Sequence, residues 1–247
     1  MSAGRPAPGG RPAPGGRPAP GRRPAPVVAW DVETCPLPDA ALSDAQRRRL
    51  DLAAAAESRR DPALGDAEAR RRAGSLHPFL GWVCCLSAAR LGPDGRAGRP
   101  KSYTAAAPSG EPALLRAWWA DAARLPPGTV WVTFNGKRFD ADWLRVRSAA
   151  HGVAPARSDL LCTYPYRHRP HADLARAFGC AHSLDDLCGL LGVARADAGP
   201  APDGGPAVSA ATVAGAVADG RLAAVARYCE ADVAATLACY ARLADAL

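Results

Sequence analysis

The chain has 247 residues, of which 48% are hydrophobic and 22% charged, as in a globular protein with one sizeable core. Because it contains neither a run of 18 apolar residues nor an apolar signal segment, the sequence predicts neither a transmembrane helix nor secretion. The net charge of +7 includes five arginines in residues 1–26, so the remaining chain is nearly balanced and gives only weak support for a polyanionic partner.

Residues 1–26 are expected to form a tail separate from a single domain at residues 27–247. The tail repeats the unit GRPAPG, and this density of Pro and Gly cannot build a core. We therefore expect disorder with local polyproline II conformation. The tail could act as a basic arm that contacts nucleic acid or a groove with aromatic walls. Arginines spaced six residues apart make a diffuse charge, which favours an extension without a specific role.

The first part of the domain reads as three strands around a helical insertion. Residues 27–34 (VVAWDVET) predict a strand, and residues 39–73 predict an arginine-rich helical segment. Its arginine clusters are expected to face solvent, although they could also contact a bound strand. Residues 82–91 and 101–107 predict two further strands, connected through the turn signal PDG at 93–95. The three strands would form a meander.

The rest of the domain alternates helix and strand. Residues 111–125 predict a helix in which Trp118 and Trp119 are expected to pack in the core instead of stacking on bases. Residues 129–136 are β-branched and aromatic and predict a buried strand. Three further helices are expected: one at residues 139–150, one that begins after an N-cap at Ser183, and one that begins at Thr212. Residues 195–207 are expected to form a Gly/Pro-rich loop. This order predicts an α/β fold with a mixed sheet flanked by helices.

The eight cysteines contain no Cys-x-x-Cys pair, and most lie among apolar residues. Small buried thiols behave as hydrophobic side chains. We therefore expect reduced cysteines in a cytoplasmic protein, in preference to disulfides or a zinc site.

Two carboxylates interrupt the first predicted strand. Because side chains alternate along a strand, Asp31 and Glu33 share one face while Val28, Trp30 and Val32 share the other. Carboxylates about 7 Å apart raise each other's pKa unless a cation neutralises them, and hard divalent ions prefer oxygen ligands. Taken alone, an exposed strand edge is the commoner explanation of such a pair.

A third acid lies in FNGKRFDADWL, after the last predicted strand. Asn135 and Gly136 predict a tight turn, and Asp140 falls in the first turn of the next helix, where the helix dipole favours an anion. Phe139 and Trp143 are four residues apart and can both face the core. Taken alone, this is an ordinary helix start.

The last predicted helix contains the sequence RYCEADVAATLACY. Tyr228 and Asp232 are four residues apart and therefore lie one turn apart on the same face. Taken alone, the tyrosine is typical of an aromatic residue at the rim of a core. The packed side of this helix is expected to carry Val225, Val233, Thr236 and Tyr240.

The three motifs D-x-E-T, F-N-G-x-x-F-D and Y-C-x-x-D occur in this order, and together they resemble the DEDD superfamily of 3′–5′ exonucleases. The chain is most similar to small stand-alone proteins predicted to be exonucleases related to the proofreading domain of family B DNA polymerases. The likeness covers residues 27–245, and position 227 holds Arg where the sister branch of the superfamily has His. The resemblance implies a ribonuclease H-like fold, with a mixed five-stranded sheet and helices on both sides.

Carried over to this sequence, the resemblance makes four acids ligands of two divalent ions, Mg²⁺ or Mn²⁺. These are Asp31, Glu33, Asp140 and Asp232, and Tyr228 becomes the residue that orients the attacking water. The implied activity is two-metal hydrolysis from the 3′ end of a nucleic acid, releasing nucleoside 5′-monophosphates. The alternative is a catalytically silent nucleic-acid-binding module on the same fold.

The expected substrate is a single strand or a frayed 3′ end, with DNA in preference to RNA, and a polymerase or repair protein is a possible partner. No membrane contact is expected. Five residues near the motifs are candidates for substrate binding, namely Asn135, Lys137, Arg138, Phe139 and Arg227. Exposed cations are common without such a role, and Phe139 could equally pack in the core. Similarly, a structural hydrogen-bonding role is preferred over metal binding for His171 and Asp173.

Overall fold

The computed structural model describes residues 25–165, 167–177, 183–195 and 204–244. All but the last two residues of the expected tail, and most of the expected loop at 195–207, lie outside these ranges. Five strands form one mixed sheet in the order β3-β2-β1-β4-β5. The strands are β1 (Val27–Pro36), β2 (Gly81–Arg90), β3 (Lys101–Thr104), β4 (Val130–Thr133) and β5 (His171–Asp173).

The pairing of the strands places the carboxyl ends of β4 and β5 beside the middle of β1. Strand β1 is antiparallel to β2 but parallel to β4, with Ala29 opposite Val132. Strand β5 continues in the same direction beside β4. The segments that follow β4 and β5 therefore start beside the middle of β1, next to Asp31 and Glu33, and the carboxyl ends of parallel strands are the usual location of sites in such sheets.

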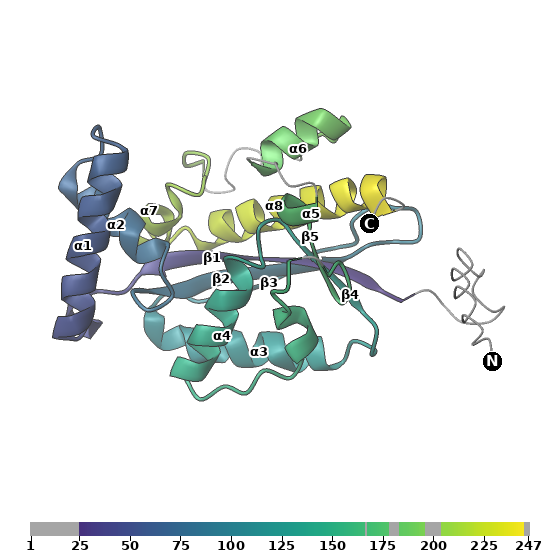
Figure 1. Ribbon diagram of the computed structural model, residues 1–247, viewed down its shortest axis with the longest axis horizontal. Coiled ribbons are helices and arrows are strands. Elements are labelled where there is room, and N and C mark those ends of the chain that lie inside the picture. Colours follow the sequence, from purple (N-terminus) through teal and green to yellow (C-terminus); the bar gives the residue numbers. More distant parts are fainter. Residues whose placement is uncertain (1–24, 166, 178–182, 196–203, 245–247) are drawn as a thin grey trace, which may run out of the picture.

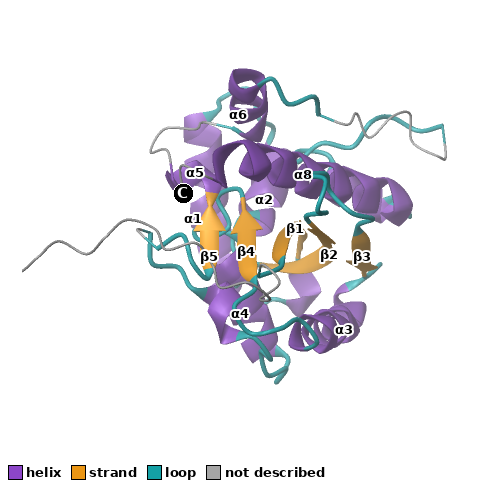
Figure 2. Cartoon of the chain, turned by 90° about the vertical axis from the view of Figure 1, so that its right-hand side faces the viewer, coloured by secondary structure: helices purple, strands orange, loops and turns teal. Residues whose placement is uncertain are grey.

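Helices cover both faces of the sheet, as expected (Figures 1 and 2). On one face, Val28, Trp30 and Val32 of β1 join the core beneath α3 (Glu111–Ala123) and α4 (Asp140–Ala150). Their alternation explains this packing, because every second residue of a strand points to the same side. The opposite face of the sheet is covered by the long helix α8 (Leu222–Leu243).

The expected helical segment at 39–73 is two helices, α1 (Asp44–Arg60) and α2 (Asp66–Ser75), which extend beyond one end of the sheet (Figure 1). The break falls at Asp61, which precedes Pro62 and adopts an extended conformation. A residue before proline is disfavoured in the helical region, so this dipeptide ends α1. The remaining elements are η1 (Asp39–Ala41), η2 (Pro108–Gly110), η3 (Ser158–Leu161), α5 (Leu174–Ala177), α6 (Leu184–Leu191) and α7 (Val213–Ala218).

Several local expectations are confirmed. Trp118 and Trp119 are each 2% exposed and pack in the core. The arginine-rich hairpin faces solvent, where its arginines form exposed ion pairs such as Arg71 with Glu68. The side chain of Ser183 caps α6 by accepting from the Asp186 amide. All seven cysteines in the described ranges are free thiols, whereas Cys180 lies outside them. No described helix has the length and hydrophobicity needed to span a membrane.

Three strands differ from the expectation. Strand β4 covers Val130–Thr133 instead of residues 129–136, because the chain leaves the sheet in the turn at Asn135. Strand β3 ends at Thr104 instead of residue 107, because Ala107 and Pro108 lead into the short helix η2. Strand β5 was not expected from local pattern at all. It has three residues, and its two polar side chains, His171 and Asp173, are buried.

Candidate active site

Strand β1 places Asp31 and Glu33 on the face of the sheet that α8 covers. One carboxylate oxygen of each residue and the Cys229 Sγ of α8 all lie within 4.8 Å of one another. The thiol of Cys229 donates to Asp31 Oδ2 over 3.3 Å. Both acids lie beyond the last β1–β4 residue pair, at the edge where the parallel strands end. The same-face arrangement expected from the strand period therefore holds in the fold.

Helix α4 delivers the third acid to the same place. The Oδ1 of Asp140 accepts a hydrogen bond from the backbone amide of Val32, 108 residues earlier, over 2.9 Å. Val32 lies between the two acids of β1, so this bond fixes the start of α4 against them. Asp140 is only 2% exposed and Glu33 only 9%. The site is thus built from buried carboxylates on two separate elements.

The turn before α4 is held by β5. Asn135 has a φ of 63°, in the left-handed region that Asn tolerates better than most residues. A Cβ at Gly136 would overlap the side chain of Thr133, so only glycine fits there. Both Asp173 oxygens accept from this turn, from the Asn135 amide over 2.8 Å and the Lys137 amide over 3.0 Å. Asp173 therefore positions the loop that leads to Asp140.

The buried ring of His171 also forms hydrogen bonds within the fold. Its Nε2 hydrogen-bonds with the Thr133 hydroxyl over 2.8 Å, and its Nδ1 with the Cys162 carbonyl over 3.1 Å. Burial lowers the pKa of His171 to about 3, so the ring is neutral. Both ring nitrogens are engaged, which agrees with the structural role preferred from the sequence.

Helix α8 contributes Tyr228 and Asp232, one turn apart on the same face. The charge of Asp232 acts on both Asp31 and Tyr228, so the two residues of α8 lie beside the acids of β1. Arg195, in the segment after α6, forms ion pairs with both Asp232 and Asp185 of that helix. Sequence reasoning missed Arg195. It is the single basic residue between positions 192 and 208, and this isolated charge could have marked it as a partner for an acid.

The four acids have raised pKa values because they are buried together. Burial, and then the charges of Asp140 and Asp232, raise the pKa of Asp31 well above its ordinary value. Burial and the charge of Asp31 do the same for Glu33. Burial raises the pKa of Asp140 to about 7 and that of Asp232 to about 6, where Arg195 partly offsets the rise. Such a set of buried oxygen donors with so little compensating charge fits hard divalent cations.

Tyr228 is half-buried beside these acids. Burial, and then the negative charge of Asp232, raise the pKa of the Tyr228 phenol well above its usual range. The hydroxyl therefore stays protonated near neutral pH. It can orient a neighbouring oxygen through a hydrogen bond, but it cannot serve as a base.

Lys137, expected to bind substrate, is instead an internal anchor. It is 4% exposed, and its ammonium donates to the carbonyl oxygens of Tyr164 and Arg167. Burial lowers its pKa. Its position close to Asp140 in the sequence favours a substrate-binding cation at the surface. In the fold, two carbonyl groups from a later loop instead accept hydrogen bonds from the buried ammonium group.

The other four substrate-binding candidates lie in different surroundings. Phe139 is half-buried, and its ring lies 5.8 Å from that of Trp143, which favours the packing alternative. Asn135 and Arg138 are exposed, next to the start of α4. Arg227 is half-buried on α8. The structure therefore leaves Asn135 and Arg138 as the accessible members of the group.

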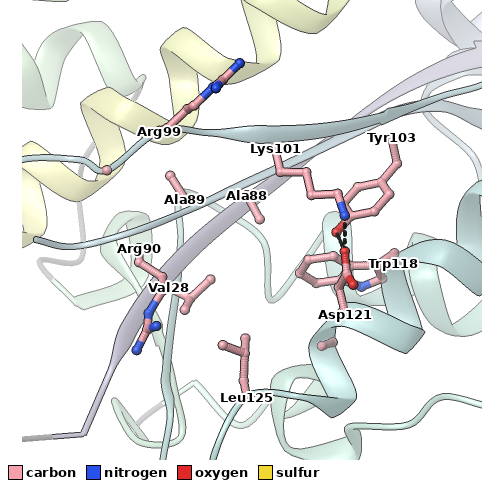
Figure 3. Close-up of a pocket in the computed structure, with 12 residues that line it drawn as sticks. Val28, Ala88, Ala89, Arg90, Arg99, Lys101, Tyr103, Trp118, Asp121 and Leu125 are labelled. Atoms are coloured by element: carbon pink, nitrogen blue, oxygen red, sulfur yellow. Dashed lines mark hydrogen bonds and ion pairs between the residues drawn. The ribbon is translucent and has the colours of Figure 1, made fainter.

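A cavity of about 420 Å³ opens on the opposite face of the sheet, between β2, β3 and α3 (Figure 3). Val28, Trp118 and Leu125 contribute its apolar walls, and the ion pair of Lys101 with Asp121 lies at one side. None of the five motif residues lines it. This cavity is separate from the acidic site.

Solved structures share the fold at low sequence identity. A family B DNA polymerase from the hyperthermophilic archaeon Pyrobaculum calidifontis matches 90% of this chain at 20% identity, with a TM-score of 0.57. Exonuclease I matches 90% of the chain at 14% identity, with a TM-score of 0.45. The chain spans 25% of the polymerase and 41% of exonuclease I. No curated protein matched the chain.

The likeness to the polymerase shows that the expected ribonuclease H-like fold is correct: a mixed five-stranded sheet flanked by helices. Residues 84–246, about two thirds of the chain, match a family model described as a predicted 3′-5′ exonuclease related to the exonuclease domain of PolB. The matched range contains Asp140, Tyr228 and Asp232 but begins after Asp31 and Glu33. The fold places these two acids against the matched part, and the chain belongs to this family of predicted 3′-5′ exonucleases.

Proposed function

We propose that the protein is a metal-dependent 3′–5′ exonuclease that removes nucleoside 5′-monophosphates from the 3′ end of a nucleic acid. One observation carries the proposal. The Val32 amide binds Asp140, which joins the D-x-E pair of β1 to an acid 108 residues away. Membership of the family supports the reaction and its direction.

Asp31, Glu33, Asp140 and Asp232 would hold two divalent ions, Mg²⁺ or Mn²⁺, because their buried oxygens match the ligands that these ions prefer. When bound, such ions make hydroxide available near neutral pH and stabilise the oxygen that leaves the scissile phosphate. The four carboxyl groups must lose their protons to bind them. Burying the four groups together raises their pKa values, so the site is most stable when bound cations neutralise the carboxylates.

Tyr228 would fix the position of the attacking water. Its hydroxyl remains protonated and lies close to Asp232, so it can direct an oxygen at the edge of the carboxylate cluster. Orientation of this kind contributes to rate by holding reacting atoms in line. The proton of the water would leave without Tyr228 acting as the base.

The proposed substrate is a single strand or a frayed 3′ end, and DNA is preferred to RNA. Kinship with the exonuclease domain of PolB supports the choice of DNA. The same kinship makes a polymerase or a repair protein the proposed partner. Such a partner would present the 3′ end to the carboxylates of β1.

A panel of single- and double-stranded DNA and RNA tests the reaction, with the 3′ or the 5′ end blocked in turn. In the presence of Mg²⁺ or Mn²⁺, we expect stepwise shortening of strands with a free 3′ end and release of 5′-monophosphates. Shortening that starts from a free 5′ end while the 3′ end is blocked would contradict the proposed direction. Binding without cleavage under every metal condition would favour the silent module.

A further inference from the structure

An exposed surface lies beside the turn that leads to Asp140. We define the Tyr164 surface as Tyr164, Arg167, Arg138 and Arg176. Tyr164 is one of the few large hydrophobic side chains in the described ranges that face solvent, at 56% exposure. The guanidinium carbon of Arg167 lies 5.5 Å from the centre of its ring. An aromatic ring with a cation beside it is a typical platform for a base.

The buried anchor Lys137 attaches this surface to the active site. Its ammonium donates to the Tyr164 carbonyl over 2.7 Å and also to the Arg167 carbonyl. Its backbone amide binds Asp173, which also holds the turn before α4. The loop that carries Tyr164 is therefore tied to a residue only three positions before Asp140.

The arginines of the surface have no acidic partner among the described residues. Arg138, Arg167 and Arg176 are exposed, and none forms an ion pair with an acid in the described part of the chain. The acids of the neighbouring segments have other partners: Asp142 pairs with Arg145, Asp159 pairs with Arg157, and Asp140 accepts from the Val32 amide. Asp173 accepts from the backbone amides of Asn135, Lys137 and Ala175.

Arg176 lies close enough to Lys137 for its charge to lower the Lys137 pKa. Arg138 is the next residue along the chain. The cations therefore gather around one anchor and form a local positive area, although the domain as a whole is nearly neutral. Phosphate groups are the polyanion that such an area beside a phosphodiesterase site would meet.

We propose that the Tyr164 surface binds the unpaired strand upstream of the 3′ end, with a base stacked on Tyr164 and phosphates held by Arg138 and Arg176. This inference rests on the proposed exonuclease function and adds to it a subsite outside the carboxylate cluster. It selects unpaired nucleotides, because a base within a duplex cannot offer its face to the ring. Stacking is tolerant of base identity, so the subsite is not sequence-specific.

The test measures binding of fluorescent oligothymidylates and oligouridylates, from 2 to 15 nucleotides long, in EDTA so that metal-dependent hydrolysis stops. Wild-type affinity is expected to rise with length until the strand reaches Tyr164. Tyr164→Ala should weaken binding of the long strands about fivefold to a hundredfold, with a much smaller effect on the shortest ones. Tyr164→Trp should retain wild-type affinity, because the larger ring also stacks.

Leu190→Ala is the matched control, since Leu190 is 82% exposed and lies on α6. The double variant Arg138→Gln with Arg176→Gln should reduce the slope of log Kd against log salt by about 1.4, or about 0.7 for each lost phosphate contact. With metal present, Tyr164→Ala should raise KM for long strands and leave kcat near the wild-type value.

If wild type cleaves these strands while Tyr164→Ala and Leu190→Ala bind alike at every length, the subsite is wrong and the exonuclease proposal stands. If the wild type neither binds nor cleaves any strand, both proposals fail. Equal loss of affinity for the shortest and the longest strands would also contradict an upstream subsite. Thermal unfolding of each variant shows whether a lost signal reflects a lost fold.

Discussion

Four carboxyl groups meet beside the middle of β1, and among the described residues they have one cationic contact, from Arg195 to Asp232. Carboxylates buried together cost stability when ionised, because each loses water and repels the others. The position of Asp140 is nevertheless fixed by the amide of Val32, so the groups cannot move apart freely. This arrangement is tolerable when protons or metal ions neutralise it.

The metal-free protein should lose stability as the pH rises from about 4 to about 7. The folded pKa values of Asp140 and Asp232, about 7 and about 6, exceed the ordinary value of 3.8. The folded state therefore binds more protons than the unfolded state in this window, and the free energy of unfolding falls with pH, by about 1.4 kcal/mol for each unit of pKa difference. Chemical denaturation in EDTA at several pH values measures it.

Asp140→Asn is the control for this trend. Because the amide cannot ionise, the free energy of unfolding of this variant should fall less steeply with pH. Added Mn²⁺ should restore stability most strongly at the upper end of the window, where the carboxylates are free to bind it. An unfolding free energy of the metal-free wild type that rises steadily between these pH values would contradict the assignment.

Tyr228→Phe should lower kcat about tenfold to a hundredfold while leaving Mn²⁺ affinity unchanged. The substitution removes only the hydroxyl that would orient the water, and the half-buried ring keeps its packing. Steady-state hydrolysis and Mn²⁺ titration measure the two effects separately. Wild-type kcat in this variant would exclude the orienting role, and a weakened metal site would indicate a structural one.

At the scale of elements, α6 and α8 are connected through Arg195, which contacts Asp185 on one helix and Asp232 on the other. A guanidinium on Asp232 competes with any metal ion that uses the same carboxylate. At pH 8, Arg195→Gln should therefore tighten Mn²⁺ binding about two- to fivefold, the equivalent of about 0.5–1 kcal/mol for a partly exposed ion pair.

Calorimetric titration of Mn²⁺ tests this expectation, with Arg242→Gln as the matched control. Arg242 is an arginine at the far end of α8, where it donates to the Leu191 carbonyl. Weaker Mn²⁺ binding in Arg195→Gln than in the control would show that Arg195 supports the metal site instead of competing with it.

The helix that presents Asp140 is fixed by a buried ion pair. Glu111 of α3 is fully buried and accepts from Arg147 of α4, from the Val83 amide of β2 and from His151. Glu111→Gln should lower the free energy of unfolding by about 3 kcal/mol or more, since it leaves the charge of Arg147 without its partner.

Glu68→Gln removes the partner of Arg71 in a surface pair and should cost about 0.5 kcal/mol. Urea denaturation of both variants, analysed side by side, compares the buried pair with the exposed one. Equal losses of unfolding free energy in the two variants would show that the contact between α3 and α4 does not depend on the charge of Glu111.

At the scale of the whole molecule, the sheet order explains why residues so distant in sequence meet. Strands β1, β4 and β5 run in the same direction, and β4 and β5 end beside the middle of β1, so the turn at Asn135 and the start of α5 lie near Asp31 and Glu33. Helix α8 then crosses that face and brings Tyr228 and Asp232 to it. The site is therefore a product of topology more than of any one local segment.

Much of this could be predicted from the sequence, for identifiable reasons. The same-face placement of Asp31 with Glu33 and the capping by Ser183 follow from local periods and local hydrogen bonds. Strand β5 could not be predicted, because three residues are too few to show alternation. The role of Lys137 could not be predicted either, since its burial depends on carbonyl groups 27 and 30 residues further along the chain.

The most direct test of the central claim compares Asp140→Asn with Asp142→Asn for Mn²⁺ binding and for hydrolysis of a 5′-labelled strand with a free 3′ end. Both acids lie in the first turn of α4, but Asp140 is buried in the carboxylate cluster while Asp142 pairs with Arg145 at the surface. We expect Asp140→Asn to lose metal binding and to reduce hydrolysis at least about a hundredfold, and Asp142→Asn to match the wild type. Hydrolysis and Mn²⁺ affinity that survive in Asp140→Asn at wild-type levels would contradict the account.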